Sequence, residues 1–187
     1  MASPSRRRRQ RSPQLRSLFR AWSLPEMQLP WLWLLGTAFL YAIAGLLMAA
    51  FPAPYWIWNL ALGGIVLQAL ALAGPRALGR MRWWPSHCAA GAAILGTTAI
   101  VVALAIALNY VGTDNVDAIS PSEVAAEVVK MSLFALVTAA LGAIISAETG
   151  DRLLMGFTRL QTSLVLAATC ILGLGLGGLI GVVAIPG

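Results

Sequence analysis

Few side chains in the apolar segments of this chain are of a type that takes part in chemistry. The single histidine, His87, precedes Cys88, and the other cysteine, Cys170, lies far along the chain. A zinc or haem site needs more ligands than one His and two separated Cys residues supply. We therefore expect no metal site and no cofactor, and two cysteines cannot form a disulfide framework.

Catalysis within a membrane usually depends on acids, His or Lys inside the spans, because burying such groups is costly and needs a reason. The apolar segments defined below contain no Asp, Glu, Arg or His, and Lys130 lies at the edge of one of them. A phosphate-binding glycine loop, a Ser-His-acid set and an HExxH motif are also missing from the sequence. We predict that the protein is not an enzyme and has no catalytic residues.

Neutral polar side chains inside the apolar segments are the remaining candidates for a role in transport. Such residues usually form hydrogen bonds to the backbone or between helices. A few lie at middle depth, where they would also suit a polar path through the protein. The path residues would be Gln68, Thr97, Thr98 and Thr138.

The composition of the chain indicates the environment of these residues. Of its 187 residues, 59% are hydrophobic and only 11% are charged. Soluble domains have about 45–50% apolar and about 25% charged residues, so a soluble globular fold is excluded. The partner that the whole chain requires is a lipid bilayer.

Five apolar segments are long enough to cross a bilayer, whose core of about 30 Å needs about 20 residues of helix. The segments are 31–51, 55–74, 88–108, 128–147 and 163–185. The first is too long for the apolar region of a signal peptide, so we expect it to be retained. The sequence predicts an all-α, polytopic transmembrane helix bundle of about five spans over residues 31–187, after a disordered tail of residues 1–30.

The distribution of basic residues predicts the orientation, because Lys and Arg are retained in cytoplasmic loops. Arginines occur before the first span, after the second and after the fourth, whereas the alternate loops have none and only Lys130 lies near the outer side. The Trp and Tyr residues recur at the ends of the spans, where aromatic rings favour the headgroup region. We expect a cytoplasmic N-terminus and a C-terminus on the outer side, in a bacterial inner membrane or an organelle membrane such as the thylakoid.

The tail is too polar and too rich in Pro and Ser to fold. Its arginines would set the orientation and contact anionic lipid or an acidic partner. Nucleic-acid binding would need aromatic residues or a folded module that the tail lacks, so we expect no nucleic-acid partner. The contact residues would be Arg6, Arg7, Arg8, Arg9 and Arg11.

Small residues recur every four positions in two of the spans, a pattern that lets membrane helices approach closely. The glycine ridge, Gly173, Gly177 and Gly181, lies in the last span, and the alanine ridge, Ala135, Ala139 and Ala143, lies in the fourth. We interpret both ridges as helix-packing faces, and the partner helix of each belongs either to this chain or to another.

Two short motifs predict how the spans are connected. The link Pro52-Ala53-Pro54 is so short that the first two spans should be antiparallel neighbours. Ser120-Pro121-Ser122-Glu123 has the spacing of a capping box, so the fourth helix should start about two turns before its apolar segment.

Three features favour a structural role over a catalytic one: no set of catalytic residues within the spans, two small-residue ridges, and no soluble domain. The leading hypothesis is a non-catalytic accessory, scaffold or assembly subunit of a larger membrane complex, whose partners are other membrane protein subunits or further copies of the chain. The alternative is a small transporter or channel that uses the neutral polar path.

Overall fold

The computed structural model describes residues 30–51, 54–75, 83–109 and 121–184. The basic tail and its arginines lie outside the described residues. Within these ranges the protein is all-α, with five helices long and apolar enough to cross a membrane, which confirms the predicted fold class and indicates an integral multi-pass protein. The helices are α2 (Trp31–Ala50), α3 (Tyr55–Leu72), α5 (Trp83–Asn109), α6 (Pro121–Leu153) and α7 (Arg159–Ala184).

Local signals explain where several helices begin or end. Helices α2 and α3 each start directly after a proline, which cannot donate a hydrogen bond from within a helix. Gly74 follows the end of α3 with a φ of 104°, a conformation that is open to glycine without strain. Helix α7 begins with a capping box in which the Thr158 backbone N–H donates to Gln161 Oε1 at 3.1 Å.

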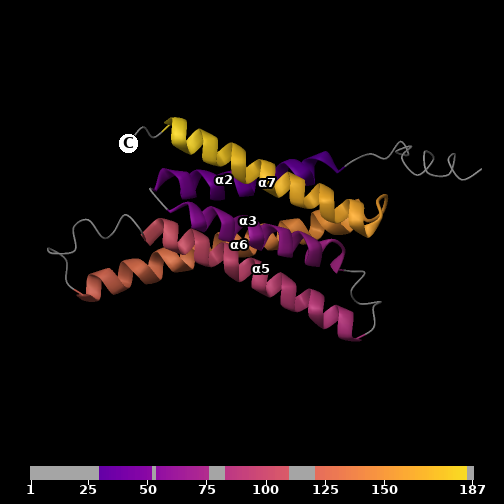
Figure 1. Cartoon of the computed structure of the whole chain (residues 1–187), viewed down its shortest axis with the longest axis horizontal. Coiled ribbons are helices and arrows are strands. Elements are labelled where there is room, and N and C mark those ends of the chain that lie inside the picture. The colour runs from indigo at the N-terminus through magenta and orange to yellow at the C-terminus, as the bar shows by residue number, and fades with distance from the viewer. Residues whose placement is uncertain (1–29, 52–53, 76–82, 110–120, 185–187) are drawn as a thin grey trace, which may run out of the picture.

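Successive helices run in alternating directions along the bundle (Figure 1). Helices α2, α5 and α7 therefore run in one direction, and α3 and α6 run in the other. The start of α2 and the end of α7 lie at opposite ends of the molecule. The end that contains the α6–α7 turn is called here the turn end. The end that contains the start of α3 and of α6 is called the link end.

The tightest helix pair is α2 and α7, which run parallel and meet along the glycine ridge. A Cβ atom added at Gly173 would collide with the Ala38 carbonyl, and one added at Gly177 would collide with the Ala42 carbonyl. One added at Gly181 would lie 2.7 Å from the Ala49 Cβ. The ridge is therefore occupied within the chain, and only glycine permits this approach of the two backbones.

A second close crossing joins α3 to α5 through Gly64 and Gly96. A Cβ atom at Gly64 would lie 2.7 Å from the Gly96 carbonyl oxygen, and one at Gly96 would lie 2.6 Å from the Gly64 carbonyl oxygen. The two glycines thus face each other, and a larger residue at either position would force the helices apart.

The first two spans are antiparallel, as expected, but they do not form a close backbone contact along their lengths. Helices α2 and α3 touch through side chains such as Tyr41 and Gln68, but α2 packs mainly on α7 and α3 packs mainly on α5. A short link brings only the two linked helix ends together. Which helices lie in contact along their lengths depends on where glycine lets backbones approach.

Three helices are longer than their apolar segments, and one of them, α7, begins at Arg159 rather than at residue 163. Helix α5 begins at Trp83 rather than at residue 88, and α6 extends from Pro121 to Leu153, beyond residues 128–147 at both ends. The early start of α6 confirms the expectation from the capping-box motif. Polar residues extend α6 because they form helix readily outside lipid, with Glu123 in its first turn and Arg152 in its last.

Candidate functional site

A cluster in the core receives one residue capable of hydrogen bonding from each of the five helices. We call it the polar hub. Four of its side chains are buried, and that of Thr97 is half-buried. The members are Tyr41, Gln68, Thr97, Ser146 and Cys170.

Hydrogen bonds connect the hub from helix to helix. The Tyr41 hydroxyl donates to Gln68 Oε1, and Gln68 Nε2 donates to Thr97 Oγ1 at 3.1 Å. The Thr97 hydroxyl donates to the Ala93 carbonyl of its own helix at 2.8 Å. Because the side chains satisfy one another, the buried amide of Gln68 is not left without partners, which would be costly in lipid.

The remaining members complete the hub on the side of α6 and α7. Ser146 and Cys170 lie next to the Tyr41 hydroxyl. The Ser146 Oγ and Cys170 Sγ atoms are 4.0 Å apart. The Tyr41 ring also faces Gly142, where an added Cβ would lie 3.6 Å from the hydroxyl oxygen. The small residue on α6 therefore leaves room for the tyrosine ring.

A second polar contact joins α2 to α6 nearer the turn end. The hydroxyls of Thr37 and Thr149 are 2.9 Å apart, and both groups also bond to the Trp33 carbonyl, at 2.8 Å and 3.4 Å. The Arg152 guanidinium lies 4.2 Å from the centre of the Trp33 ring and pairs with Glu148 at 3.0 Å. The cation–π contact thus holds the end of α6 against the start of α2, while the ion pair with Glu148 lies within α6 and positions the guanidinium.

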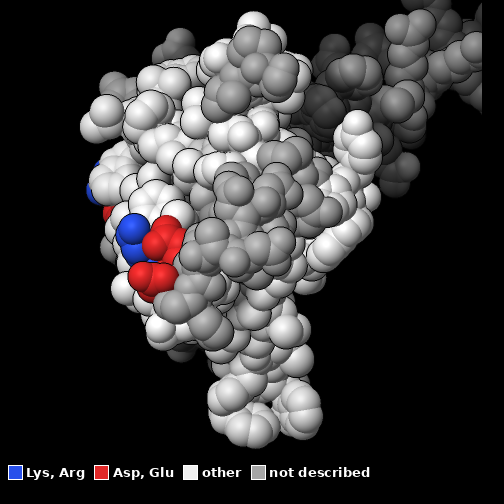
Figure 2. Space-filling view, turned by 90° about the vertical axis from the view of Figure 1, so that its left-hand side faces the viewer, with Lys and Arg blue, Asp and Glu red and all other residues white. Residues whose placement is uncertain are grey.

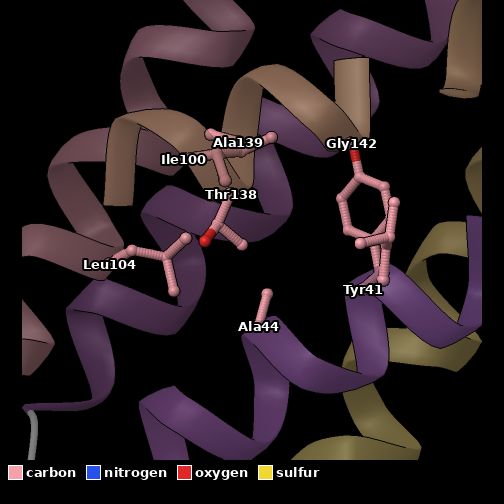
Figure 3. Close-up of a pocket in the computed structure, with 8 residues that line it drawn as sticks. Tyr41, Ala44, Ile100, Leu104, Thr138, Ala139 and Gly142 are labelled. Atoms are coloured by element: carbon pink, nitrogen blue, oxygen red, sulfur yellow. The ribbon is translucent and has the colours of Figure 1, made fainter. Parts of the chain in front are cut away.

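Beside the hub lies a small cavity between α2, α5 and α6 (Figure 3). Its volume of about 10 Å³ is at the lower limit for one water molecule, which would need two or more polar partners. Most of its lining is apolar, and the Thr138 hydroxyl donates to the Phe134 carbonyl of its own helix at 2.9 Å. The cavity is too small and too apolar to serve as a substrate site.

The structure divides the residues of the predicted polar path. Gln68 and Thr97 come together in the hub, where they bind each other. Thr98 is exposed on the outer surface of α5, and the hydroxyl of Thr138 is used by its own helix. Toward the link end the core beyond the hub is filled by fully buried apolar side chains, among them Met48, Ile57 and Leu104.

The two small-residue ridges both face the interior. The glycine ridge lies against α2, as described above. On α6, Ala135 and Ala139 are buried in the main apolar cluster, and Ala143 is half-buried. The outward face of α6 has larger residues, including Leu133, Val137, Leu141 and Ile144.

Sequence reasoning missed three hub residues, Tyr41, Ser146 and Cys170, and the second glycine crossing. Tyr41 differs from Tyr55 and Tyr110 in lying at the middle of a span instead of at an end, which was a usable signal for a buried hydroxyl partner. Cys170 was considered only as a metal ligand. Gly64 has Leu60 and Gln68 at four-residue spacing, so no small-residue ridge marked its side of the crossing.

Within the described part of the chain, no three His, Cys, Asp or Glu residues lie close enough together to hold a metal ion. No protein-family model matches the chain, and neither the curated proteins nor the solved structures include a significant match.

Proposed function

We propose that this chain is a non-catalytic, multi-pass subunit of a membrane protein complex. The proposal is supported by the interior of the bundle, whose side chains are engaged in contacts between its own helices. Both small-residue ridges and the hub are engaged in holding the five helices together. The hub contains no Asp, Glu, His, Lys or Arg, and the cavity beside it is too small for a substrate. What remains for interaction is the outside of the bundle.

The observation that carries the proposal is the length of α6. Its 33 residues span about 50 Å at 1.5 Å per residue, whereas a bilayer core is about 30 Å thick. Its first turns project past the other helices at the link end (Figure 1). From residue 122 to Lys130 every residue is exposed except the half-buried Val124.

The projecting turns have both apolar and charged surface. Val128 is 43% exposed and Val129 is 66% exposed, while Lys130 pairs with Glu127 at 3.5 Å. Figure 2 shows basic and acidic side chains that lie together in a compact group on this side of the molecule. Exposed valines beside an ion pair on a projecting helix suit a contact with a protein partner, which is either another subunit or a second copy.

The proposed orientation places the turn end on the cytoplasmic side. Arg152 and Arg159 lie at this end, together with Trp31, Trp33 and Trp83, whereas Tyr55 and Trp56 lie at the link end. This arrangement agrees with retention of basic residues in the cytoplasm and with aromatic rings at both interfaces. The projection of α6 would then extend on the outer side.

The test is the native mass of the tagged full chain after gentle solubilisation from its own membrane, with mass spectrometry of what comigrates. We expect a stoichiometric assembly. Val129→Glu should reduce recovery of the partner about tenfold, because a buried charge without a partner costs more than the 1.4 kcal/mol that tenfold represents.

Met155→Glu is the matched control. Met155 is 80% exposed at the turn end, so the same charge is added to an equally accessible residue far from the projection. Glutamate also has little influence on orientation. A chain that runs alone as a monomer would refute the proposal, and equal partner recovery from both variants would refute the role of the α6 projection.

A further inference from the structure

A large apolar groove opens at the link end between α2, α3 and α7. Its volume is about 840 Å³, in the range of small-molecule sites. The end of α2 forms one wall with Met48 and Phe51, and Trp58 of α3 forms the other. Gly175 and Leu179 of α7 lie between the walls.

The groove follows from the helix packing already described. Helices α2 and α3 are consecutive in the chain, but their backbones make little close contact. Helix α3 reaches α7 through Trp58, whose ring would lie 2.7 Å from a Cβ added at Gly178. At Gly175 an added Cβ would meet nothing within 4 Å, so the floor of the groove is open.

The position of the groove indicates what fills it. Its lining on α7 extends from Gly175 to Val182, about 10 Å along the helix, which lies within one leaflet of a core about 30 Å thick. Tyr55 and Trp56, 91% and 55% exposed, lie where the groove reaches the helix ends, as aromatic residues do at the headgroup region. None of the lining residues is charged at neutral pH.

A gap of this size between membrane helices would forfeit the dispersion contacts of its lining if it were vacant. No residue of the described ranges covers it. The groove is also continuous with the α2–α7 interface, where Gly178 lies beside Gly45.

We propose that the groove is a lipid-binding site that holds one acyl chain of a bilayer lipid between α2 and α3, with the headgroup beside Tyr55 and Trp56. The acyl chain fills the space between α2 and α3 at the link end, and so the lipid is a structural component of the bundle. This proposal does not depend on the proposed function.

The test uses native mass spectrometry of the full chain in detergent, titrated with palmitoyl-oleoyl phosphatidylcholine. We expect one saturable lipid adduct before any weaker ones. Gly175→Phe places a ring in the open floor of the groove. It should weaken binding of the first lipid about tenfold, which raises log Kd by about one unit.

Gly63→Phe is the matched control, because Gly63 is exposed on α3 outside the groove lining and an added Cβ there also meets nothing within 4 Å. If Gly175→Phe does not fold, Val182→Trp narrows the groove from a residue that is 66% exposed. Equal lipid binding by the wild type and a folded groove variant would overturn the proposal. Recovery of an isoprenoid instead of an acyl lipid from the purified chain would overturn the assigned occupant.

Discussion

Gln68 is the residue that connects the hub, because its amide accepts from Tyr41 on α2 and donates to Thr97 on α5. Its own helix, α3, makes its main contact with α5, so the bond to Tyr41 adds a link across to α2. Hydrogen bonds between membrane helices contribute modestly on average, since the unfolded chain in the membrane also finds partners.

We expect Gln68→Leu to lower the free energy of unfolding by about 1–2 kcal/mol, because it leaves the hydroxyl of Tyr41 without its acceptor. The measurement is reversible unfolding in mixed micelles. Thr138→Val is the control, since that hydroxyl bonds only within its own helix in the structure. If the two variants lose equal stability, the hub bonds do not contribute as proposed.

At the scale of helices, backbone contact at glycine decides the arrangement. Helix α7 provides Gly173, Gly177 and Gly181 to α2, and Gly64 meets Gly96 where α3 crosses α5. Close approach matters in lipid because apolar side chains gain little from leaving hydrocarbon for another helix.

A pair of alanine substitutions on α7 tests this account. Gly177→Ala should destabilise the bundle by about 1–3 kcal/mol, because its methyl group would overlap the Ala42 carbonyl. Gly175→Ala, half a turn away, meets nothing and should be neutral or stabilising by up to about 1 kcal/mol through helix propensity. The check is the shift in apparent Tm of each variant in the same detergent. Equal shifts would contradict a tight α2–α7 contact at Gly177.

For the whole molecule, the alternating helix directions link the positions of all helix ends. Once the membrane side of one helix end is known, the side of every other helix end follows. The start of α2 and the end of α7 lie at opposite ends of the bundle (Figure 1). The orientation of the whole bundle can therefore be determined from one label at each end.

We expect a membrane-impermeant maleimide to label Ala125→Cys in intact cells, and Met155→Cys only after the cells are permeabilised. Both residues are exposed, Ala125 on the α6 projection and Met155 in the α6–α7 turn. The background is Cys88→Ser, which removes the exposed native thiol, whereas Cys170 is buried and is retained. The opposite labelling pattern would reverse the proposed orientation.

The sequence by itself determined that the chain is all-α and where its five apolar segments lie, because span length and apolar composition are local properties. The start of α6 at Pro121 was also predictable from its capping motif. Orientation, partners and the role of the basic tail stay predictions.

Only the tertiary structure decided which helices touch. That α7 lies against α2, that five separate polar residues meet at Tyr41 and Gln68, and that α2 and α3 leave a groove depend on the rotation and register of each helix. These are set by contacts between residues far apart in the chain, such as Gly177 with Ala42, and no local pattern specifies them.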